Sequence, residues 1–496
     1  MKTRDAGVLL HISSLPGKWF IGDMGSDAYE FIDFLNESGL KYWQILPTGI
    51  VGAGNSPYQS ISAFAGNPLF INIPKLVEMG FLLESDISNV KLKKTDKSDF
   101  QKAEELKQPF LKKAFENFKN MDESNKWDCY RFCDSQSYWI DDYAIFKALK
   151  DKFDGKPWYE WEENLKNYNY DEIENKRAEL GEEVYLNKFI QYLYFKQIKE
   201  LKDYANKKSV KLIGDIPIFV SYDSADVWSK SYLFHLDENK ERTVVAGVPP
   251  DYFSETGQLW GNPLYNWSSM KSDDYLWWRF RFESLMLQTD LIRLDHFRGF
   301  EAYWEVPASE ETAINGRWVE GPSFNFFEIL QKYFNKLPII AEDLGVITDE
   351  VENLRDSFGF PGMKILQFAF GDSPRNPFLL HNHTYNSIVY TGTHDNSTTL
   401  GWYKDAKKNN KKIISDLKNY CILDEKDPVW SIIETVLSSV AKTAIIPMQD
   451  FLNLDDNSRM NTPGTPTGNW LWKMDKQADK TLSNKIYKSL VKFNRI

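Results

Sequence analysis

The stretch LIRLDHFRGF, from Leu291 to Phe300, begins with the apolar residues of a buried strand and ends with charged ones. Side chains alternate between the two faces of a strand, so we expect Arg293 and Asp295 on one face and His296 on the other. A guanidinium within about 4–6 Å lowers the pKa of a carboxyl by roughly 1–3 units, which would keep Asp295 ionised. Such a carboxylate is either a nucleophile or charge stabiliser, or half of a structural ion pair at a strand end.

Seven other stretches repeat this pattern of a short apolar run bounded by turn residues, and several end in an acidic residue. The eight runs cover residues 6–12, 42–47, 211–220, 291–297, 338–345, 362–368, 387–395 and 444–452. After the first run, residues 28–35 have the apolar spacing of a helix, with Ser26 placed to cap it and Gly39 to end it. Eight buried strands alternating with helices predict an α/β fold, a parallel (β/α)8 TIM barrel.

Two intervals between the runs are too long for single connections. Residues 75–205 are rich in Lys, Glu, Asn and Asp with helical spacing, and they predict a helical insertion. Residues 221–289 are dense in Trp, Tyr, Pro and Gly, and they predict a loop-rich insertion over the active site. We therefore expect residues 1–496 to form a single catalytic barrel with two insertion subdomains and no separate C-terminal β domain.

The charge and composition exclude several classes of protein. The net charge of −11 disfavours nucleic acid and anionic membranes as partners. The chain has no apolar run of 18 residues, and the apolar part of its first segment is short and broken by His11, so we expect neither a membrane span nor a signal peptide, and a cytoplasmic location.

The cysteines and histidines give no sign of a cofactor. Cys129 and Cys133 have no histidine nearby to complete a zinc site, so we interpret them as free thiols. The glycines of GAGNSP, residues 52–57, lack the third glycine of a dinucleotide loop, and HNH at 381–383 is an isolated loop pair. We expect no metal ion and no organic cofactor, and LDDNS at 454–458 is the first place where a cation would contradict this.

Four carboxylates fall at the carboxyl ends of the expected strands: Asp215, Asp295, Glu342 and Asp395. In a barrel these ends share one rim, which carries the active site. An acidic rim suits either a divalent cation or glycosyl transfer by a carboxylate nucleophile and a carboxylic acid. Arg293 beside the carboxylates argues against a cation, and 17 tryptophans favour a sugar substrate because aromatic rings stack on pyranoses.

Seven motifs carry a resemblance to a known family. In chain order they are SPYQSISAFAGNPLFI, GDIPIFV, GVPPDYFSETGQLWGNPLYNW, RLDHFRGF, AEDLG, THDNSTT and PGTPTGNWLW. This set resembles the amylomaltases, the 4-α-glucanotransferases of glycoside hydrolase family 77 in the α-amylase clan, over residues 6–473. The resemblance implies the same barrel and a retaining transfer of α-1,4-glucan segments from a donor chain to the 4-hydroxyl of an acceptor.

The resemblance also assigns roles to residues of this chain. It implies that Asp295 is the nucleophile, that Glu342 is the general acid/base, kept protonated by the neighbouring anions, and that Asp395 holds donor hydroxyls and stabilises the transition state. The substrate-binding residues that it implies are Ser56, Tyr58, Asp215, Asp251, Trp260, Arg293, His394 and Asn469.

Several of these assignments have alternatives. Asp215 serves equally well to orient Arg293, and Asp343 is expected to be structural because it points away from Glu342. The motif GDIPIFV lacks the Asn-His pair of the α-amylases, so His11 or another group would have to make part of that contact. Lys473 stands where the family usually has arginine.

The expected partners are maltooligosaccharides and glucans derived from starch or glycogen, and the sequence leaves the oligomeric state open. Two other functions remain: a retaining α-glucan hydrolase with the same carboxylates, and a non-catalytic glucan-binding protein. Transfer is favoured because the stretches 247–265 and 463–472 would hold aromatic rings over the cleft, where they bind acceptor sugars and exclude water. The rings concerned are Trp260, Tyr265, Trp470 and Trp472.

Overall fold

The computed structural model describes residues 3–90, 92–250 and 254–496. Its centre is a closed barrel of eight parallel strands, in the order β1-β12-β11-β10-β9-β6-β3-β2. The strands are β1 (Asp5–Leu9), β2 (Tyr42–Gln44), β3 (Lys211–Ile216), β6 (Leu291–Leu294), β9 (Ile339–Ala341), β10 (Gly362–Ile365), β11 (Ser387–Tyr390) and β12 (Thr443–Pro447). Each of the eight apolar runs supplies one of these strands, so the predicted (β/α)8 barrel is confirmed.

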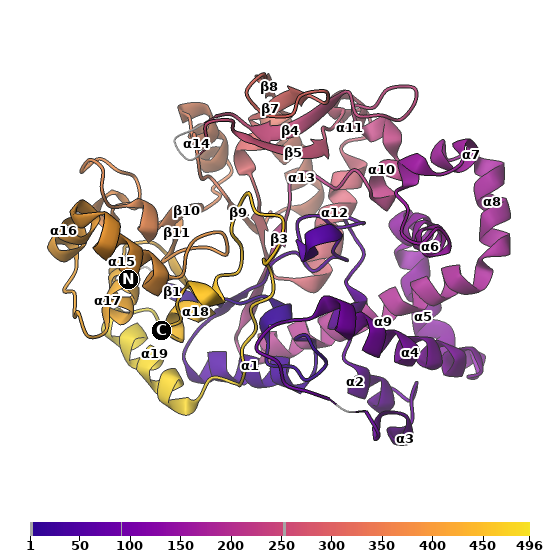
Figure 1. Cartoon of the computed structure of the whole chain (residues 1–496), viewed down its shortest axis with the longest axis horizontal. Coiled ribbons are helices and arrows are strands. Elements are labelled where there is room, and N and C mark those ends of the chain that lie inside the picture. The colour runs from indigo at the N-terminus through magenta and orange to yellow at the C-terminus, as the bar shows by residue number, and fades with distance from the viewer. Residues whose placement is uncertain (1–2, 91, 251–253) are drawn as a thin grey trace.

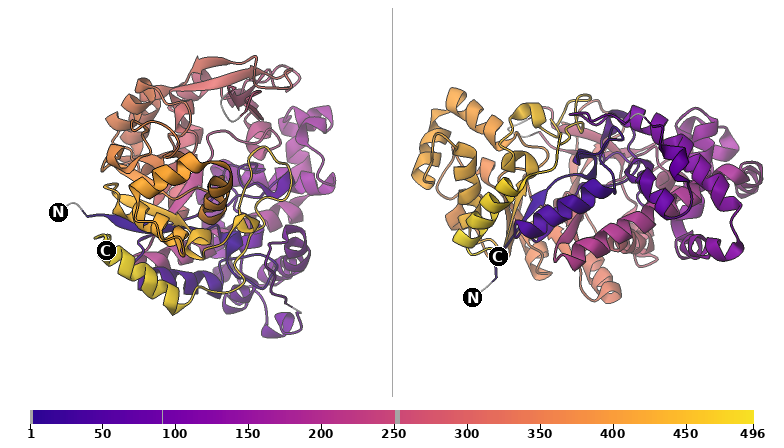
Figure 2. Two further views of the ribbon diagram at one scale, coloured as in Figure 1. Left: turned by 60° about the vertical axis from the view of Figure 1, so that its left-hand side comes forward. Right: turned by 90° about the horizontal axis from the view of Figure 1, so that it is seen from below.

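Helices between the barrel strands surround the barrel (Figures 1 and 2). They are α1 (Ser26–Glu37), α12 (Leu276–Gln288), α13 (Ser323–Phe334), α14 (Asp349–Ser357), α15 (Thr399–Asn409), α16 (Lys411–Tyr420) and α17 (Pro428–Ser438). Helix α1 begins one residue earlier than predicted. Gly25 is its N-cap, and Ser26, the predicted cap, is its first helical residue. Gly39 follows the helix with φ +76°, a left-handed conformation that glycine adopts without strain, so the predicted end is correct.

Residues between β2 and β3 form a group of helices on one side of the barrel, at the right of Figure 1. They are α2 (Ile73–Glu78), α3 (Glu84–Ile87), α4 (Phe100–Lys119), α5 (Glu123–Ser135), α6 (Ser137–Lys152), α7 (Glu163–Lys166), α8 (Tyr170–Glu179) and α9 (Gly181–Lys207). Helix α9 contacts α1, α12 and β3 of the barrel as well as α4, α5, α6 and α8. It therefore joins the helical group to the barrel.

A second, four-stranded antiparallel sheet lies at the top of Figure 1, in the order β5-β4-β7-β8. Its strands are β4 (Val244–Val248), β5 (Gln258–Pro263), β7 (Ala302–Pro307) and β8 (Arg317–Glu320), with the short helices α10 (Ala225–Ser229) and α11 (Trp267–Lys271) beside β4 and β5 in the chain. The segment 221–289 is therefore not only looped, because it supplies two strands. Their partners β7 and β8 follow β6, outside the segment that the sequence delimited.

The chain after β12 continues through α18 (Met448–Phe451) and a long loop to α19 (Lys480–Lys492). Helix α19 packs on α1 and α17, which brings the two ends of the chain to the same side of the barrel (Figure 2). These described residues add no strand to either sheet.

Candidate active site

The four candidate carboxylates lie at the carboxyl ends of four barrel strands. Asp215 is the next-to-last residue of β3, Asp295 directly follows β6, Glu342 directly follows β9, and Asp395 lies in the loop after β11. Because all eight strands are parallel, these positions share one rim of the barrel.

Arg293 is the cation at the centre of this rim. It pairs with Asp215 in the register of β3 and β6, and its Nη1 lies 2.9 and 2.8 Å from the two carboxylate oxygens of Asp215 and 2.8 Å from Oδ1 of Asp295. Burial lowers the pKa of Arg293, but the two carboxylates outweigh it and raise that pKa well above its ordinary value. The prediction that Arg293 and Asp295 share one face is confirmed. Burial raises the pKa of Asp215; Arg293 opposes this, and Asp295 adds to it.

Asp215 is enclosed between Arg293 and Tyr58. Its side chain has no exposed surface, and the Tyr58 hydroxyl donates a hydrogen bond to its Oδ2 at 2.7 Å. These contacts use the carboxylate to hold Arg293 and Tyr58, which favours the orienting role over a sugar contact. The Tyr58 ring stacks on His394, with centroids 5.3 Å apart and planes 15° apart, and tilts against Trp470.

Glu342 is a buried carboxyl held by two backbone N–H groups. The N–H of His296 donates to its Oε2 at 2.7 Å, and the N–H of Leu344 donates to its Oε1 at 3.1 Å. Burial raises the pKa of Glu342 to about 8; Arg293 opposes this, and Asp295 adds to it. Glu342 is thus protonated at neutral pH. Burial is the main cause, and the neighbouring anions, to which the sequence-based prediction ascribed the protonation, add to it.

Asp395 is held by His394, which was predicted from the sequence, and by Arg459 and Asn461, which were not. Asn461 Nδ2 donates to its Oδ1 at 2.6 Å, Arg459 donates to its main-chain oxygen at 2.5 Å, and His394 Nε2 lies 3.3 Å from its Oδ2. The side chain keeps 44% of its surface exposed, more than Asp295 with 25%. Arg459 and Asn461 are more than 60 residues away in the chain, so no local spacing could have found them.

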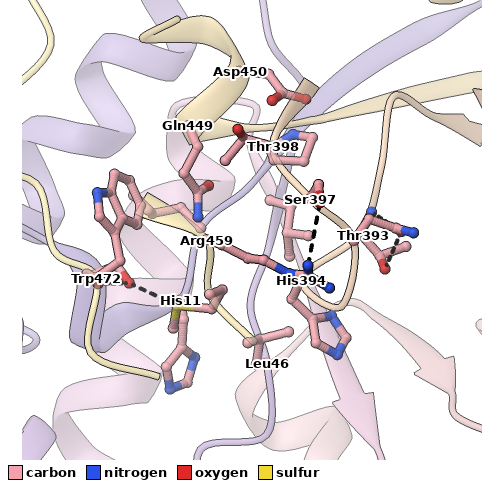
Figure 3. Close-up of a pocket in the computed structure, with 16 residues that line it drawn as sticks. His11, Leu46, Thr393, His394, Ser397, Thr398, Gln449, Asp450, Arg459 and Trp472 are labelled. Atoms are coloured by element: carbon pink, nitrogen blue, oxygen red, sulfur yellow. Dashed lines mark hydrogen bonds between the residues drawn. The ribbon is translucent and has the colours of Figure 1, made fainter. Parts of the chain in front are cut away.

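A cavity of about 30 Å³ lies behind His394, between the ends of β1, β11 and β12. Figure 3 shows His11 and His394 on its wall, with the guanidinium of Arg459 reaching toward Ser397. Burial lowers the pKa of His11 to about 3, so its ring is neutral. Its Nδ1 has no hydrogen-bond partner among the described residues. His11 thus lies at the back of the His394 site. It is the residue named from the sequence for the contact that the Asn-His pair makes in the α-amylases and that the motif GDIPIFV lacks.

The remaining sequence candidates differ in how close they come to the carboxylates. Trp260, in β5, meets the ring of His296 edge-on at 4.9 Å, beside Asp295. The amide of Asn469 accepts from the N–H of Thr462 and donates to the Thr465 oxygens, so it closes its own loop.

Three further expectations concern loops around the cleft. Ser56 Oγ accepts a hydrogen bond from the N–H of Tyr58 at 3.3 Å and thereby shapes the Tyr58 turn. Asp251 lies outside the described residues. The expectation that Tyr265 lies over the cleft is wrong, because the ring is fully buried and its hydroxyl donates to the Ile218 carbonyl. Trp470 packs on His394, whereas Trp472 lines the cavity behind it.

Structural roles account for several other residues that the sequence brought forward. Asp343 pairs with Arg355 at 2.5 Å and accepts from the N–H of Met363, as expected for a residue pointing away from Glu342. Lys473 is buried and donates to the carbonyl of Gly17, and burial lowers its pKa to about 8. His383 bonds Ser439 Oγ and the Phe378 carbonyl.

Within the described parts of the chain, no group of three or more His, Cys, Asp or Glu side chains is arranged to hold a metal ion. Cys129, Cys133 and Cys421 are free thiols. No helix in these parts combines the length and apolar character needed to cross a bilayer.

Known proteins share both the sequence and the structure of this chain. The family model described as 4-alpha-glucanotransferase matches residues 10–479. The 4-alpha-glucanotransferase of Thermus thermophilus is 46% identical over 477 residues, which are 95% of both chains. That of Clostridium butyricum is 46% identical over 492 residues, 97% of this chain and 98% of its own. The structure of the amylomaltase from Streptococcus agalactiae in complex with acarbose superimposes with a TM-score of 0.95 and 38% identity, covering 99% of each chain.

Proposed function

The chain belongs to the 4-alpha-glucanotransferase family, glycoside hydrolase family 77, and we propose that Asp295, Glu342 and Asp395 carry out its reaction as a retaining double displacement. The enzyme transfers α-1,4-glucan segments from a donor chain to an acceptor. The observation that carries the proposal is a buried Glu342 carboxyl, protonated at neutral pH, on the same rim as an Asp295 that is paired with Arg293.

In the first step, Asp295 attacks the anomeric carbon of the donor glucose. The bond from that carbon to the glycosidic oxygen breaks, and Glu342 gives its proton to the oxygen, so the rest of the donor chain leaves as an alcohol. The product is a glycosyl ester on Asp295. Arg293 lies 2.8 Å from Oδ1 of the nucleophile and holds that carboxylate in place, and the exposed face of Asp395 is available to sugar hydroxyls.

In the second step, Glu342, now a carboxylate, takes the proton of an acceptor 4-hydroxyl. The acceptor oxygen attacks the anomeric carbon and displaces Asp295, so a new α-1,4 bond forms and the configuration is retained. Water can enter the same step, and then the outcome is hydrolysis. Trp260 supports transfer, because its ring beside His296 offers an apolar surface on which an acceptor glucose can stack and displace water.

The enzyme acts on α-glucans. Maltooligosaccharides and glucans derived from starch or glycogen are the proposed donors and acceptors. The aromatic cluster of Tyr58, His394 and Trp470 supports this choice, because such rings match the apolar faces of glucose units. The cytoplasmic location and the lack of a nucleic-acid partner remain predictions from the sequence.

Incubation with pure maltotriose tests the proposal. We expect glucose and a series of longer maltooligosaccharides, with the total number of reducing ends nearly constant, because each transfer consumes one chain end and creates another. A rise in reducing ends in step with substrate loss, with no product longer than maltotriose, would instead establish a hydrolase. Unchanged maltotriose that still binds would establish a non-catalytic glucan-binding protein.

A further inference from the structure

His296 stands where strand β6 has ended and the chain turns over Glu342. Its backbone is left-handed, with φ 49° and ψ 50°. The N–H of His296 donates to Oε2 of Glu342 at 2.7 Å, and the next N–H, of Phe297, donates to the main-chain oxygen of Glu342 at 3.0 Å. Successive N–H groups of a strand point to opposite sides. The turn at His296 is what directs two consecutive N–H groups to the same residue.

This turn places one peptide group between the two proposed reacting carboxyls. The N–H that holds Glu342 belongs to the peptide bond that begins at Asp295, and the N–H of Asp295 itself is bonded to the Ile216 carbonyl of β3 at 3.0 Å. The backbone thereby fixes Glu342 relative to Asp295. Retaining transfer requires a set separation between these groups, since the nucleophile and the acid act on opposite sides of the same bond.

The side-chain ring of His296 makes a separate contact, with Trp260. It meets Trp260 edge-on at 4.9 Å with an interplanar angle of 79°. A side chain at position 299 would approach the ring, because a Cβ built on Gly299 lies 3.0 Å from its Cδ2. The Nε2 atom is buried and has no hydrogen-bond partner among the described residues. The ring therefore serves as a packing surface for Trp260.

We propose that His296 is a positioning residue with two separable actions: its left-handed backbone holds Glu342 at a fixed place beside Asp295, and its ring seats Trp260 against the acceptor. The inference rests on the proposed function, which makes Glu342 the acid/base and Trp260 an acceptor contact. It extends that function by assigning the two actions to two parts of one residue.

Residue type separates the two actions. Asparagine tolerates the left-handed conformation but has no ring, alanine tolerates it less well and has no ring either, and a β-branched valine strongly disfavours it. The comparison of His296→Asn with His296→Ala therefore tests the backbone with the ring absent from both, and His296→Val is the extreme case. Asn335→Val is the control for a valine at another non-glycine residue with positive φ: Asn335 is exposed, has φ 58° and ψ −49°, and ends α13 at the opposite end of the barrel.

The measurement is the pH dependence of kcat/KM for maltotriose disproportionation, together with KM for glucose as acceptor. The charged groups that face Glu342 are Arg293 and Asp295 at the end of β6 and Asp343 beside it, and every variant leaves them in place. Loss of the N–H bond to the carboxylate raises the pKa of Glu342, so the basic limb should move to higher pH by about 0.5–1 unit in His296→Val and by less in His296→Ala. We expect kcat/KM to fall about 10- to 100-fold in His296→Val because Glu342 is misplaced.

His296→Asn should keep the basic limb of the wild type while KM for glucose rises about 3- to 10-fold, because Trp260 loses its support. Asn335→Val should change neither quantity. The inference is overturned if His296→Asn moves the limb as far as His296→Ala, or if the His296 variants lower only thermal stability. If His296→Val does not fold, the comparison of His296→Asn with His296→Ala still tests the role of the left-handed backbone.

One further substrate separates a failure of this inference from a failure of the proposed function. A maltosyl fluoride has a leaving group that needs no protonation, so Glu342→Ala should still release fluoride from it, without the basic limb of the wild type. Should that limb persist in Glu342→Ala, Glu342 is not the acid and the proposed function fails. Should the limb vanish there but not respond to the His296 variants, only the role of His296 fails.

Discussion

Two buried groups of charges in this molecule differ in how completely their partners surround them. Lys107 of α4 donates to Asp23 at 2.7 Å and to the carbonyls of Leu69 and Ile71 at 2.7 and 2.9 Å, and the two side chains of the pair are 0% and 5% exposed. The remaining oxygen of Asp23 accepts from the N–H of Gly25 and from Asn72 Nδ2. Every donor of this ammonium is used, and the pair joins the helical group to the barrel.

The second group lies at the catalytic rim, the rim of the barrel that carries Asp215, Asp295 and Glu342. There, one guanidinium nitrogen of Arg293 contacts two carboxylates, and Asp295 keeps a quarter of its side-chain surface exposed. Glu342 is buried with a pKa of about 8. The first group is arranged to hold the fold together, since all its polar atoms have partners. The second leaves charge and a proton available, which costs stability and makes chemistry possible.

The largest expected effect is the loss of turnover in Asp295→Asn. The amide is nearly isosteric but cannot form the ester intermediate, so maltotriose disproportionation should fall by at least about 10⁴-fold. The protein should stay folded and still bind maltodextrin, because Arg293 retains Asp215. Product analysis and thermal unfolding of the same preparation measure both. Activity within about tenfold of the wild type, a barrier change of only ~1.4 kcal/mol, would exclude the nucleophile role.

The opposite pattern is expected for Lys107→Met. Removing one member of a saturated buried pair leaves Asp23 as an uncompensated charge, so the free energy of unfolding should fall by about 3–5 kcal/mol. The kcat of the folded fraction should remain within about threefold, because the pair does not contact the catalytic rim. Denaturant unfolding followed by activity assays of the folded protein measures the two quantities.

Two controls sharpen this result. The double variant Lys107→Met with Asp23→Leu should recover a large part of the lost stability, since replacing both buried charges removes the unpaired one. Lys199→Met breaks the exposed pair with Asp203, whose side chains are 67% and 51% exposed, and should change stability little. If Lys107→Met is as mild as Lys199→Met, the comparison between the two buried groups does not hold.

The smallest of these effects is a gain of stability in Glu342→Gln at alkaline pH. The folded carboxyl has a pKa of about 8, above its ordinary value of 4.5, so the folded state keeps a proton that the unfolded state releases between these pH values. The stability linked to this proton is complete below pH 4.5 and is lost as the pH rises through about 8. Glutamine has no such proton, so Glu342→Gln should be more stable than the wild type by roughly 2–4 kcal/mol at pH 9.

Unfolding of both proteins at pH 5 and pH 9 measures this difference, which should be small at the lower pH. The wild type should also lose kcat/KM on the basic side near pH 8, as the general acid ionises. A stability difference that is the same at both pH values would mean that Glu342 is not held protonated by burial.

The parts of the site that the sequence predicted are those that depend on neighbours in the chain. Arg293 and Asp295 share a face because they are two residues apart at the end of a strand. The same rule does not extend to His296, because β6 ends at Leu294 and the left-handed turn at His296 is not part of the strand. No pattern of apolar and polar residues marks such a turn, since histidine occurs in many conformations.

The parts that the sequence missed depend on contacts between distant segments. In the second sheet β4 pairs with β7, and β6 of the barrel lies between these two strands in the chain. The segment 221–289 on its own therefore contained only half of the strands of this sheet. Asn461 reaches Asp395 from a loop after β12, and Tyr58 reaches Asp215 from a loop after β2. The position of Tyr265 was predicted wrongly for the same reason. Its ring packs in the core against residues from outside its own loop.

The sequence by itself determined the eight strands, their order in the chain and the acidic residues at their ends, because a buried parallel strand needs a continuous apolar run and a turn after it. Its motifs also indicated the family and the roles of Asp295, Glu342 and Asp395, which stay predictions until the variants are measured. The tertiary structure alone decided which charges meet. It placed Arg293 between two carboxylates, directed the N–H of His296 at Glu342, and buried Glu342 so that it retains a proton, since the pKa of a carboxyl depends on the solvent and charges around it.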